Sequence, residues 1–289
     1  PNEMGEIETA LRGPPAVHEA VVLTHEQAPG DKRIVAYVVP EAERASTVRT
    51  LARYRKEGLL QGLTTEELPN GLVVLHRNRV ESRFVYQEIF EDNTYARQNI
   101  TVKDGDCIFD VGANIGLFSL LLGQRYRDVK VFAFEPIPDI FHILQLNVGL
   151  FGAEVEALQC GLADRPRQEV FTYYPNVSIV SGRYADMEQE QEVIRSYERN
   201  RQRGAEEGVL DEQAVKEVVE ARLVSKQVTC ELKTVSQVIR EQGVQRIDLL
   251  KIDVEKSEKD VLLGIEEEDW ARIRQVVVEV HDLDGRLAW

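Results

Sequence analysis

Two short stretches carry residues whose types and spacing suit the binding of a small nucleotide-like molecule. The first, DVGANIG, ends a predicted strand with Asp110 and continues through Gly112, Asn114 and Gly116. A glycine turn lets a ligand approach the backbone because no Cβ atom intrudes, and the helix after it begins with free N–H groups. The second stretch, FAFEP, ends the next predicted strand with Glu135. A carboxylate in that place can accept two hydrogen bonds from a ribose diol.

The glycine turn leaves two classes of ligand open. Its glycines depart from the G-x-G-x-x-G spacing, in which the backbone wraps the pyrophosphate of a dinucleotide. Asp110 and Asn114 suit the ammonium and carboxylate of an amino-acid tail, and S-adenosylmethionine combines such a tail with a ribose. On the residues alone NAD fits about equally well, so an NAD-binding dehydrogenase domain stays open as an alternative.

The elements that position these stretches alternate between strands and helices. Strands are predicted over residues 107–112, 129–136, 155–164, 247–253 and 273–282, and helices over 116–126, 139–152, 235–244 and 257–265. This alternation predicts an α/β fold with a mostly parallel sheet covered by helices on both faces. In such folds ligands bind outside the carboxyl ends of the strands, where both stretches fall.

Bulk composition narrows the partners and the compartment. The formal net charge is −15, which argues against a large nucleic-acid interface because phosphate binding needs a basic surface. Apolar runs such as residues 116–123 are far too short to span a bilayer, so no membrane partner is expected. The three cysteines are far apart and form neither a disulfide framework nor a zinc spacing, which favours a cytoplasmic location.

Residues 1–43 predict one helix and two strands, too little to form an independent core. The motifs GEIE, PAVHEAVV and PGDKRIVAYVV occur there in that order. They resemble the carboxy-terminal subdomain of nonribosomal peptide synthetase adenylation domains. The lysine-bearing motif of that family is absent, so the resemblance implies no adenylation by this chain itself. Residues 44–70 are predicted to contain a linker or lid helix.

Residues 71–289 resemble the FkbM-type family of S-adenosylmethionine-dependent methyltransferases. The resemblance rests on DVGANIGLFSL, FEP, NVSIVSGRYAD, KIDVEKSE and VVVEVHD, in that order. It implies the class I methyltransferase fold, a Rossmann-like sheet of seven strands with one of them antiparallel. It also implies methylation at oxygen more often than at nitrogen. In DVEKSE the family usually has glycine where this chain has Lys256, which could change a loop near the acceptor.

The order of the two resemblances suggests the setting. In nonribosomal peptide synthetases, methyltransferases are often inserted within the adenylation carboxy-terminal subdomain, and this chain reproduces that junction. We therefore expect an O-methyltransferase domain acting on a Tyr, Ser or Thr hydroxyl of an aminoacyl or peptidyl substrate tethered to a phosphopantetheinylated carrier protein. The remaining adenylation domain is a second expected partner. Methylation of the α-nitrogen is the alternative, although domains of that kind usually carry a turn closer to G-x-G-x-G.

The resemblance extends the expected cofactor site beyond the two opening stretches. Pro136 belongs to the FEP motif beside Glu135. Tyr95, shortly before the first sheet strand, could cover the cofactor, and Asp164, after the third strand, could approach the adenine. Residues 186–226 are rich in charge and show helical apolar spacing, which predicts a helical insertion that is either a solvated hairpin or a lid and docking face.

Methyl transfer to a hydroxyl requires removal of its proton, by a base or with the help of a metal. His281 follows an apolar strand at its carboxyl end, and an imidazole is a good base near neutral pH. Glu279 shares a strand face with His281. Asp253 and Glu255 end the strand that faces the transferred methyl in this fold. As an alternative, Asp253, His281 and Asp282 could ligate Mg²⁺, which prefers oxygen ligands.

Overall fold

The structure is a computed structural model of the 289-residue chain. It describes residues 3–14, 17–26, 31–41, 45–92, 95, 100–151, 154–192, 194, 219 and 221–280. The chain divides into two compact units, Pro1–Gln61 and Gly62–Trp289. The first unit thus includes the predicted linker helix, and the second begins before residue 71.

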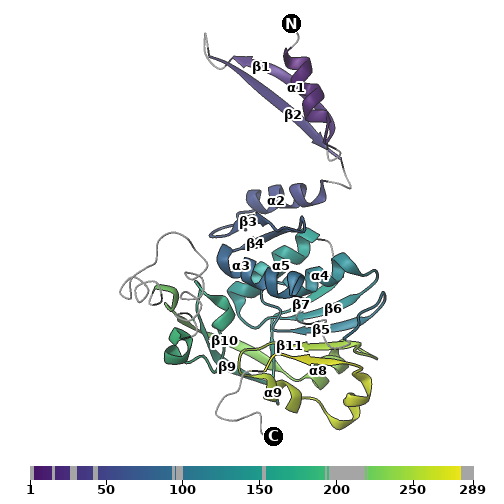
Figure 1. Ribbon diagram of the computed structural model, residues 1–289, viewed down its shortest axis with the longest axis vertical. Coiled ribbons are helices and arrows are strands. Elements are labelled where there is room, and N and C mark those ends of the chain that lie inside the picture. Colours follow the sequence, from purple (N-terminus) through teal and green to yellow (C-terminus); the bar gives the residue numbers. More distant parts are fainter. Residues whose placement is uncertain are drawn as a thin grey trace. The chain divides into compact units, whose positions relative to one another are not determined.

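The first unit is a helix on a two-stranded hairpin, followed by a second helix (Figure 1). Its elements are α1 (Glu3–Arg12), β1 (Val17–Glu26), β2 (Lys32–Pro40) and α2 (Ser46–Lys56). The antiparallel strands bury Ala20 and Val22, and Glu8 of α1 accepts the N–H of Val22 at 2.8 Å. The predicted helix and two strands are confirmed.

The second unit is built around a five-stranded parallel sheet with the order β12-β11-β5-β6-β7. These strands are β5 (Cys107–Val111), β6 (Lys130–Phe134), β7 (Val155–Leu158), β11 (Leu249–Ile252) and β12 (Val276–Val278). The helices that accompany the sheet are α4 (Leu117–Arg125), α5 (Pro138–Phe151), α8 (Val235–Glu241) and α9 (Glu258–Leu263), with the 3-10 helix η4 (Glu267–Arg272) before β12. The predicted α/β fold is confirmed. Seven strands in one sheet, one of them antiparallel, are not found among the described residues.

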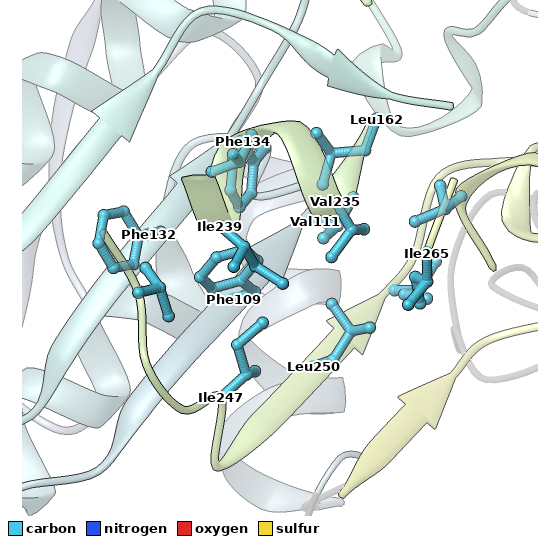
Figure 2. Close-up of a cluster of buried hydrophobic side chains, with 14 of the residues drawn as sticks. Phe109, Val111, Phe132, Phe134, Leu162, Val235, Ile239, Ile247, Leu250 and Ile265 are labelled. Carbon is cyan, nitrogen blue, oxygen red and sulfur yellow. The ribbon is translucent and has the colours of Figure 1, made fainter. Parts of the chain in front are cut away.

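Alternating side chains of the strands build a core on each face of the sheet. Figure 2 shows the larger cluster, in which Phe109, Phe132 and Phe134 meet side chains of α8 such as Val235 and Ile239. On the opposite face, Ala133 packs with Leu144 of α5. Because the strands are buried on both faces, their sequences are almost continuously apolar, and this is why they could be predicted.

A small antiparallel hairpin precedes the sheet and is tied to it by one buried amide. It consists of β3 (Thr64–Glu67) and β4 (Val73–His76) and leads into α3 (Arg79–Tyr86) and the π-helix η1 (Gln87–Glu91). Asn147 of α5 accepts the N–H of Leu75 at 2.7 Å and donates to the Leu75 carbonyl at 3.0 Å. The same amide donates to the carbonyl of Ile115, in the glycine turn, at 2.9 Å. One side chain therefore joins the hairpin to the turn.

Beside the main sheet lies a second sheet, in the order β8-β10-β9, that the sequence did not predict. Its strands are β8 (Gly161–Leu162), β9 (Arg167–Tyr173) and β10 (Lys226–Lys233), and the 3-10 helix η3 (Ser178–Val180) follows β9. The prediction of one strand over residues 155–164 was wrong: the chain leaves the main sheet after Leu158 and pairs with β10 from Gly161. Of the predicted insertion, residues 187–192 are helical, and much of the rest lies outside the described residues.

Candidate active site

A cavity opens at the carboxyl ends of the parallel strands. The residues that directly follow four of these strands line it, namely Gly112, Glu135, Asp253 and Glu279. Further walls come from α3 and η1 and from the segment around η3, which contribute Phe84, Val85, Glu88, Ile89, Ser178, Ile179, Ser181 and Arg183. Because β5 lies between β11 and β6, Glu135 is on one side of the glycine turn, and Asp253 and Glu279 are on the other.

The glycine turn adopts a shape that its two glycines make possible. Gly112 has φ of 80°, and a Cβ atom there would lie 1.7 Å from the carbonyl oxygen of Asp253. Gly116 has φ of 93°, and a Cβ atom would lie 2.6 Å from Leu144. Asn114, between them, is also left-handed at 50°, a region that asparagine tolerates better than most residues. The backbone at Gly112 thus lies against the turn after β11, with no room for a side chain.

Asp110 lies beneath this turn and does not line the cavity. Its carboxylate is fully buried, accepts a hydrogen bond from Ser119 Oγ at 2.7 Å, and lies 3.2 Å from Lys251 Nζ. A direct contact between Asp110 and the amino-acid tail of a ligand therefore stays a prediction. The geometry shows instead that Asp110 anchors the helix after the turn, through Ser119, and the neighbouring strand, through Lys251.

Lys251 of β11 connects the two sides of the turn. Besides Asp110, its ammonium lies 3.4 Å from Asp253 Oδ2 and 3.2 Å from the carbonyl oxygen of Gly112. Burial by itself would lower the pKa of Lys251, but the two carboxylates outweigh it and raise the pKa. The lysine is therefore charged at neutral pH. The rings of Tyr95 and Phe118 lie 5.1 and 5.8 Å from its ammonium.

Glu135 is a buried carboxylate in the half of the cavity beyond β6. It is 5% exposed, and its Oε1 accepts the N–H of Ile137 at 2.9 Å. Burial raises its pKa to about 7, against the opposing effect of N–H groups from Ile137 and Asn114. Pro136 lines the cavity beside it. A carboxylate in this setting gains from any ligand that donates hydrogen bonds to it, such as a ribose diol.

Tyr95 joins the carboxylates of the other half. Its hydroxyl donates to Asp253 Oδ2 at 2.7 Å and lies 3.4 Å from Glu279 Oε2. Burial and the neighbouring Asp253 raise the pKa of Tyr95 above its usual range, so the phenol keeps its proton. Tyr95 therefore acts here as a hydrogen-bond donor that holds two carboxylates near each other.

The structure places the other predicted residues as follows. Glu255 lines the cavity and has φ of 47°. Asp164 does not line it; Arg167 holds this side chain at 2.8 Å and lowers its pKa. His281 and Asp282 lie outside the described residues. No group of three metal-ligating side chains occurs among the residues that the structure describes, so the alternative magnesium site gains no support from them.

Three charged residues of the cavity were not singled out from the sequence. Lys251 is the lone charge within the apolar strand β11, and that isolation could have marked it. Arg183 belongs to the SGRYAD stretch that carried the family resemblance. Glu88 lies on a π-helix, an element that is frequent at functional sites but has no clear sequence signal.

A Rossmann-like sheet with a glycine turn after one strand and a buried glutamate after the next defines an α/β protein that suits a ribose-bearing cofactor. The chain belongs to the FkbM methyltransferase family, because the family model of the methyltransferase FkbM domain matches residues 110–287. It is therefore an S-adenosylmethionine-dependent methyltransferase, and the dehydrogenase alternative is set aside.

Relatives place this domain in the setting of a nonribosomal peptide synthetase. The chain is 43% identical over 294 residues to the AMB antimetabolite synthetase AmbE of Pseudomonas aeruginosa. This match covers 99% of this chain and 13% of that protein. It is 40% identical over 223 residues to the 31-O-demethyl-FK506 methyltransferase FkbM of Streptomyces tacrolimicus, covering 77% of this chain and 84% of that one. A stretch of 57 residues is 47% identical to a dimodular nonribosomal peptide synthase of Bacillus subtilis, covering 20% of this chain and 2% of that protein.

These findings confirm the predicted FkbM domain in a synthetase context. The chain spans only about an eighth of AmbE, so the activity of any larger protein does not transfer directly. None of the helices in the described part of the chain is long and apolar enough to cross a bilayer.

Proposed function

We propose that this domain transfers a methyl group from S-adenosylmethionine to a side-chain hydroxyl of an amino acid carried by a synthetase. The observation that carries the proposal is a single cavity lined by residues from both sides of the glycine turn. One half holds the buried Glu135, and the other holds Asp253, Tyr95 and Glu279. Such a cavity offers separate places for a cofactor ribose and for the reacting end of an acceptor.

The residues present fit the cofactor. The Glu135 carboxylate would accept the ribose hydroxyls, and the backbone of Gly112 and Asn114, which line the cavity, would face the amino-acid tail. Pro136 and Tyr95 line the same cavity. When bound, S-adenosylmethionine supplies a methyl group on a positively charged sulfur, which a suitably aligned nucleophile can displace.

The acceptor side requires alignment and removal of a proton. We assign removal of the acceptor's proton to His281, which comes two residues after Glu279 in the sequence. Asp253 already accepts a hydrogen bond from Tyr95 and lies beside Lys251, so it serves as an orienting carboxylate rather than as a base. Glu279 and Glu255 would position the acceptor or His281 from the same half of the cavity.

The acceptor and partners follow from the relatives. FkbM of Streptomyces tacrolimicus is named as a methyltransferase that acts on a 31-O-demethyl compound, which favours oxygen as the acceptor. AmbE is named as a synthetase, and synthetases present their substrates on carrier proteins. We therefore propose a Tyr, Ser or Thr type hydroxyl on a phosphopantetheine-tethered aminoacyl or peptidyl group, with the remaining adenylation domain as a neighbour, in the cytoplasm.

Methylation of the α-nitrogen is the second candidate. The acceptor half of the cavity has Glu88, Asp253 and Glu279 in its walls, and carboxylates attract an α-ammonium group. Oxygen remains the first candidate because the relative from Streptomyces tacrolimicus is named for a 31-O-demethyl substrate.

The decisive test is intact-mass and fragmentation analysis of tyrosyl-, seryl- and threonyl-carrier proteins after incubation with S-adenosylmethionine, with and without a chelator. A methyl group on the side-chain oxygen would support the proposal, and chelator resistance would favour a protein base over a metal. A methyl group on the α-nitrogen would select the second candidate. Transfer to none of these acceptors would contradict both, and calorimetry with S-adenosylmethionine would then show whether cofactor binding remains.

A further inference from the structure

The turn between β11 and α9 contains two consecutive left-handed residues, neither of them glycine. Glu255 has φ of 47° and Lys256 has φ of 72°. Ordinary side chains are strained in this region, so a lysine persists there only when its surroundings hold it. The N–H of Lys256 donates to Glu258 Oε1 at 2.9 Å, which closes the turn. Asp253, Val254, Glu255 and Ser257, on both sides of Lys256, line the active-site cavity.

The side chain of Lys256 makes the contacts that hold this residue in its left-handed conformation. Its ammonium lies 2.6 Å from Glu190 Oε1 and donates to Gln189 Oε1 at 3.1 Å. Both charged side chains of the ion pair are largely buried, at 12% exposed for Lys256 and 4% for Glu190. Glu190 and Gln189 belong to the helix over residues 187–192, whose start is capped by Asp186. A buried ion pair therefore links the cavity turn to the helix that opens the insertion.

A second set of contacts fastens the same two segments a few residues earlier. The Arg183 side chain, 2% exposed, pairs with Asp260 of α9 and lies 3.0 Å from Glu169 of β9. Its Nε donates to Ser257 Oγ at 3.3 Å. Arg183 and Ser181 themselves line the cavity. The segment that leads into the insertion is thus held in place as a wall of the cavity.

We propose that Lys256 is a positioning residue that determines acceptor selectivity. Through Glu190 it fixes the distance between the turn that carries Glu255 and Ser257 and the wall that carries Arg183. Lys256 does not line the cavity itself, so it acts through these neighbours. The inference rests on the proposed methyl transfer to a carrier-bound acceptor and adds to it that the helix over residues 187–192 helps to shape the acceptor pocket.

Three variants separate the ion pair from the backbone. Lys256→Gly removes the ammonium and relieves the left-handed strain, Lys256→Asn removes the ammonium and keeps a residue that tolerates this conformation, and Glu190→Gln removes the partner charge. Glu188→Gln is the matched control, because Glu188 is exposed on the same helix. Each variant is assayed for KM and kcat with seryl- and tyrosyl-carrier proteins, for affinity toward S-adenosylmethionine, and for melting temperature.

We expect the acceptor KM to rise about ten-fold in all three variants, with unchanged cofactor affinity and a changed ratio of kcat/KM between the two acceptors. Lys256→Gly should melt somewhat below the wild type, because Glu190 stays buried without its counterion, and the unchanged cofactor affinity distinguishes the effect from loss of structure. Combining Lys256→Gly with Glu190→Gln should add nothing further, because both remove the same ion pair. Acceptor constants that match the wild type in every variant would overturn the proposal.

Hydrogen exchange gives a readout that does not depend on turnover. The backbone amides of residues 254–258 should exchange faster in Lys256→Asn and in Glu190→Gln than in Glu188→Gln. If the wild type methylated no carrier-bound acceptor, the proposed function would fail, and exchange alone would decide about Lys256. Unchanged exchange would then overturn the positioning role, whereas faster exchange would support it.

Discussion

Lys251 of β11 places its ammonium 3.2 Å from the carboxylate of Asp110, directly across from it on β5. Both side chains are almost completely buried, at 4% and 0% exposed. A buried pair contributes little net stability when complete, but removing one partner leaves an uncompensated charge inside the protein. The pair therefore makes the two strand ends interdependent.

Lys251→Met should destabilise the protein by about 3–5 kcal/mol at pH 8, because Asp110 and Asp253 lose their common counterion. Urea unfolding at pH 8 measures this loss, with Lys103→Met, at an exposed site, as control. Equal midpoints for the two variants would contradict this reading.

In the wild type the contribution of Lys251 to stability should depend on pH only in the alkaline range. Because the carboxylates raise the folded pKa of Lys251 above its unfolded value, the stability that the lysine contributes is fully present below the unfolded pKa, near 10.4. It is lost only as pH rises further, toward the folded pKa. The contribution of Lys251 to the free energy of unfolding should therefore be constant between pH 5 and pH 9.

Gly112→Ala should be far more damaging than a comparable change at another left-handed glycine. At Gly105, with φ of 78°, a Cβ atom would meet nothing within 4 Å, so Gly105→Ala should cost about 1–2 kcal/mol for its backbone conformation alone. At Gly112 the same atom would lie 1.7 Å from the Asp253 carbonyl oxygen. Chemical unfolding should give a clearly larger loss for Gly112→Ala, together with weakened cofactor binding. Similar losses at the two sites would show that the turn can move aside.

Glu135→Gln should raise the stability of the ligand-free protein at alkaline pH and weaken cofactor binding. The folded pKa of Glu135, about 7, is above its ordinary value of 4.5, so burial of the charged form costs stability as pH rises through that interval. The glutamine does not ionise, and the melting temperature of the variant should exceed that of the wild type at pH 8 but not at pH 4.

In the same variant the affinity for S-adenosylmethionine should fall about ten-fold or more, since an amide is a weaker acceptor for a diol than a carboxylate. In the wild type this affinity should increase between pH 6 and pH 8 as Glu135 ionises. Calorimetry across this range tests both statements. An unchanged affinity in Glu135→Gln would remove Glu135 from the cofactor site.

His281→Ala should spare cofactor binding and lower turnover by about 10²–10⁴-fold, the usual contribution of a general base. His25→Ala, exposed on β1 in the first unit, is the control. The pH profile of kcat should lose its acidic limb in His281→Ala if the imidazole takes the proton. Retained turnover would assign proton removal to another group.

The parts of the fold that could be predicted are those buried on two faces. The strands β5, β6 and β11 are short, mostly apolar runs. Asp110 lies near the end of β5, and Glu135 and Asp253 directly follow β6 and β11, so both the strands and the residues at their ends stood out. The strands β9 and β10 were missed although KQVTCELK alternates polar residues with Val228, Cys230 and Leu232, the pattern of a half-buried strand. They become strands by pairing with each other, although more than fifty residues separate them in the chain.

The contacts within the site were harder to predict from the sequence than the residues that form it. The sequence placed Asp110 and Asp253 at strand ends, but the role of Lys251 depends on the register that sets it opposite Asp110. Tyr95 was expected as a cover for the cofactor, whereas its hydroxyl contacts Asp253. Lys256 departs from the family motif, which the sequence shows. That its ammonium pairs with Glu190 is visible only in the structure.

The three hydrogen bonds of Asn147 bear on where the smallest independently folding enzyme would start. The family model begins at residue 110, yet this amide binds both Leu75 of β4 and Ile115 of the glycine turn. A protein trimmed to the family match would keep every glycine of the turn but would leave buried donor and acceptor groups of Asn147 without partners. The hairpin upstream is thus structurally part of the domain, and a transplanted domain should carry it along.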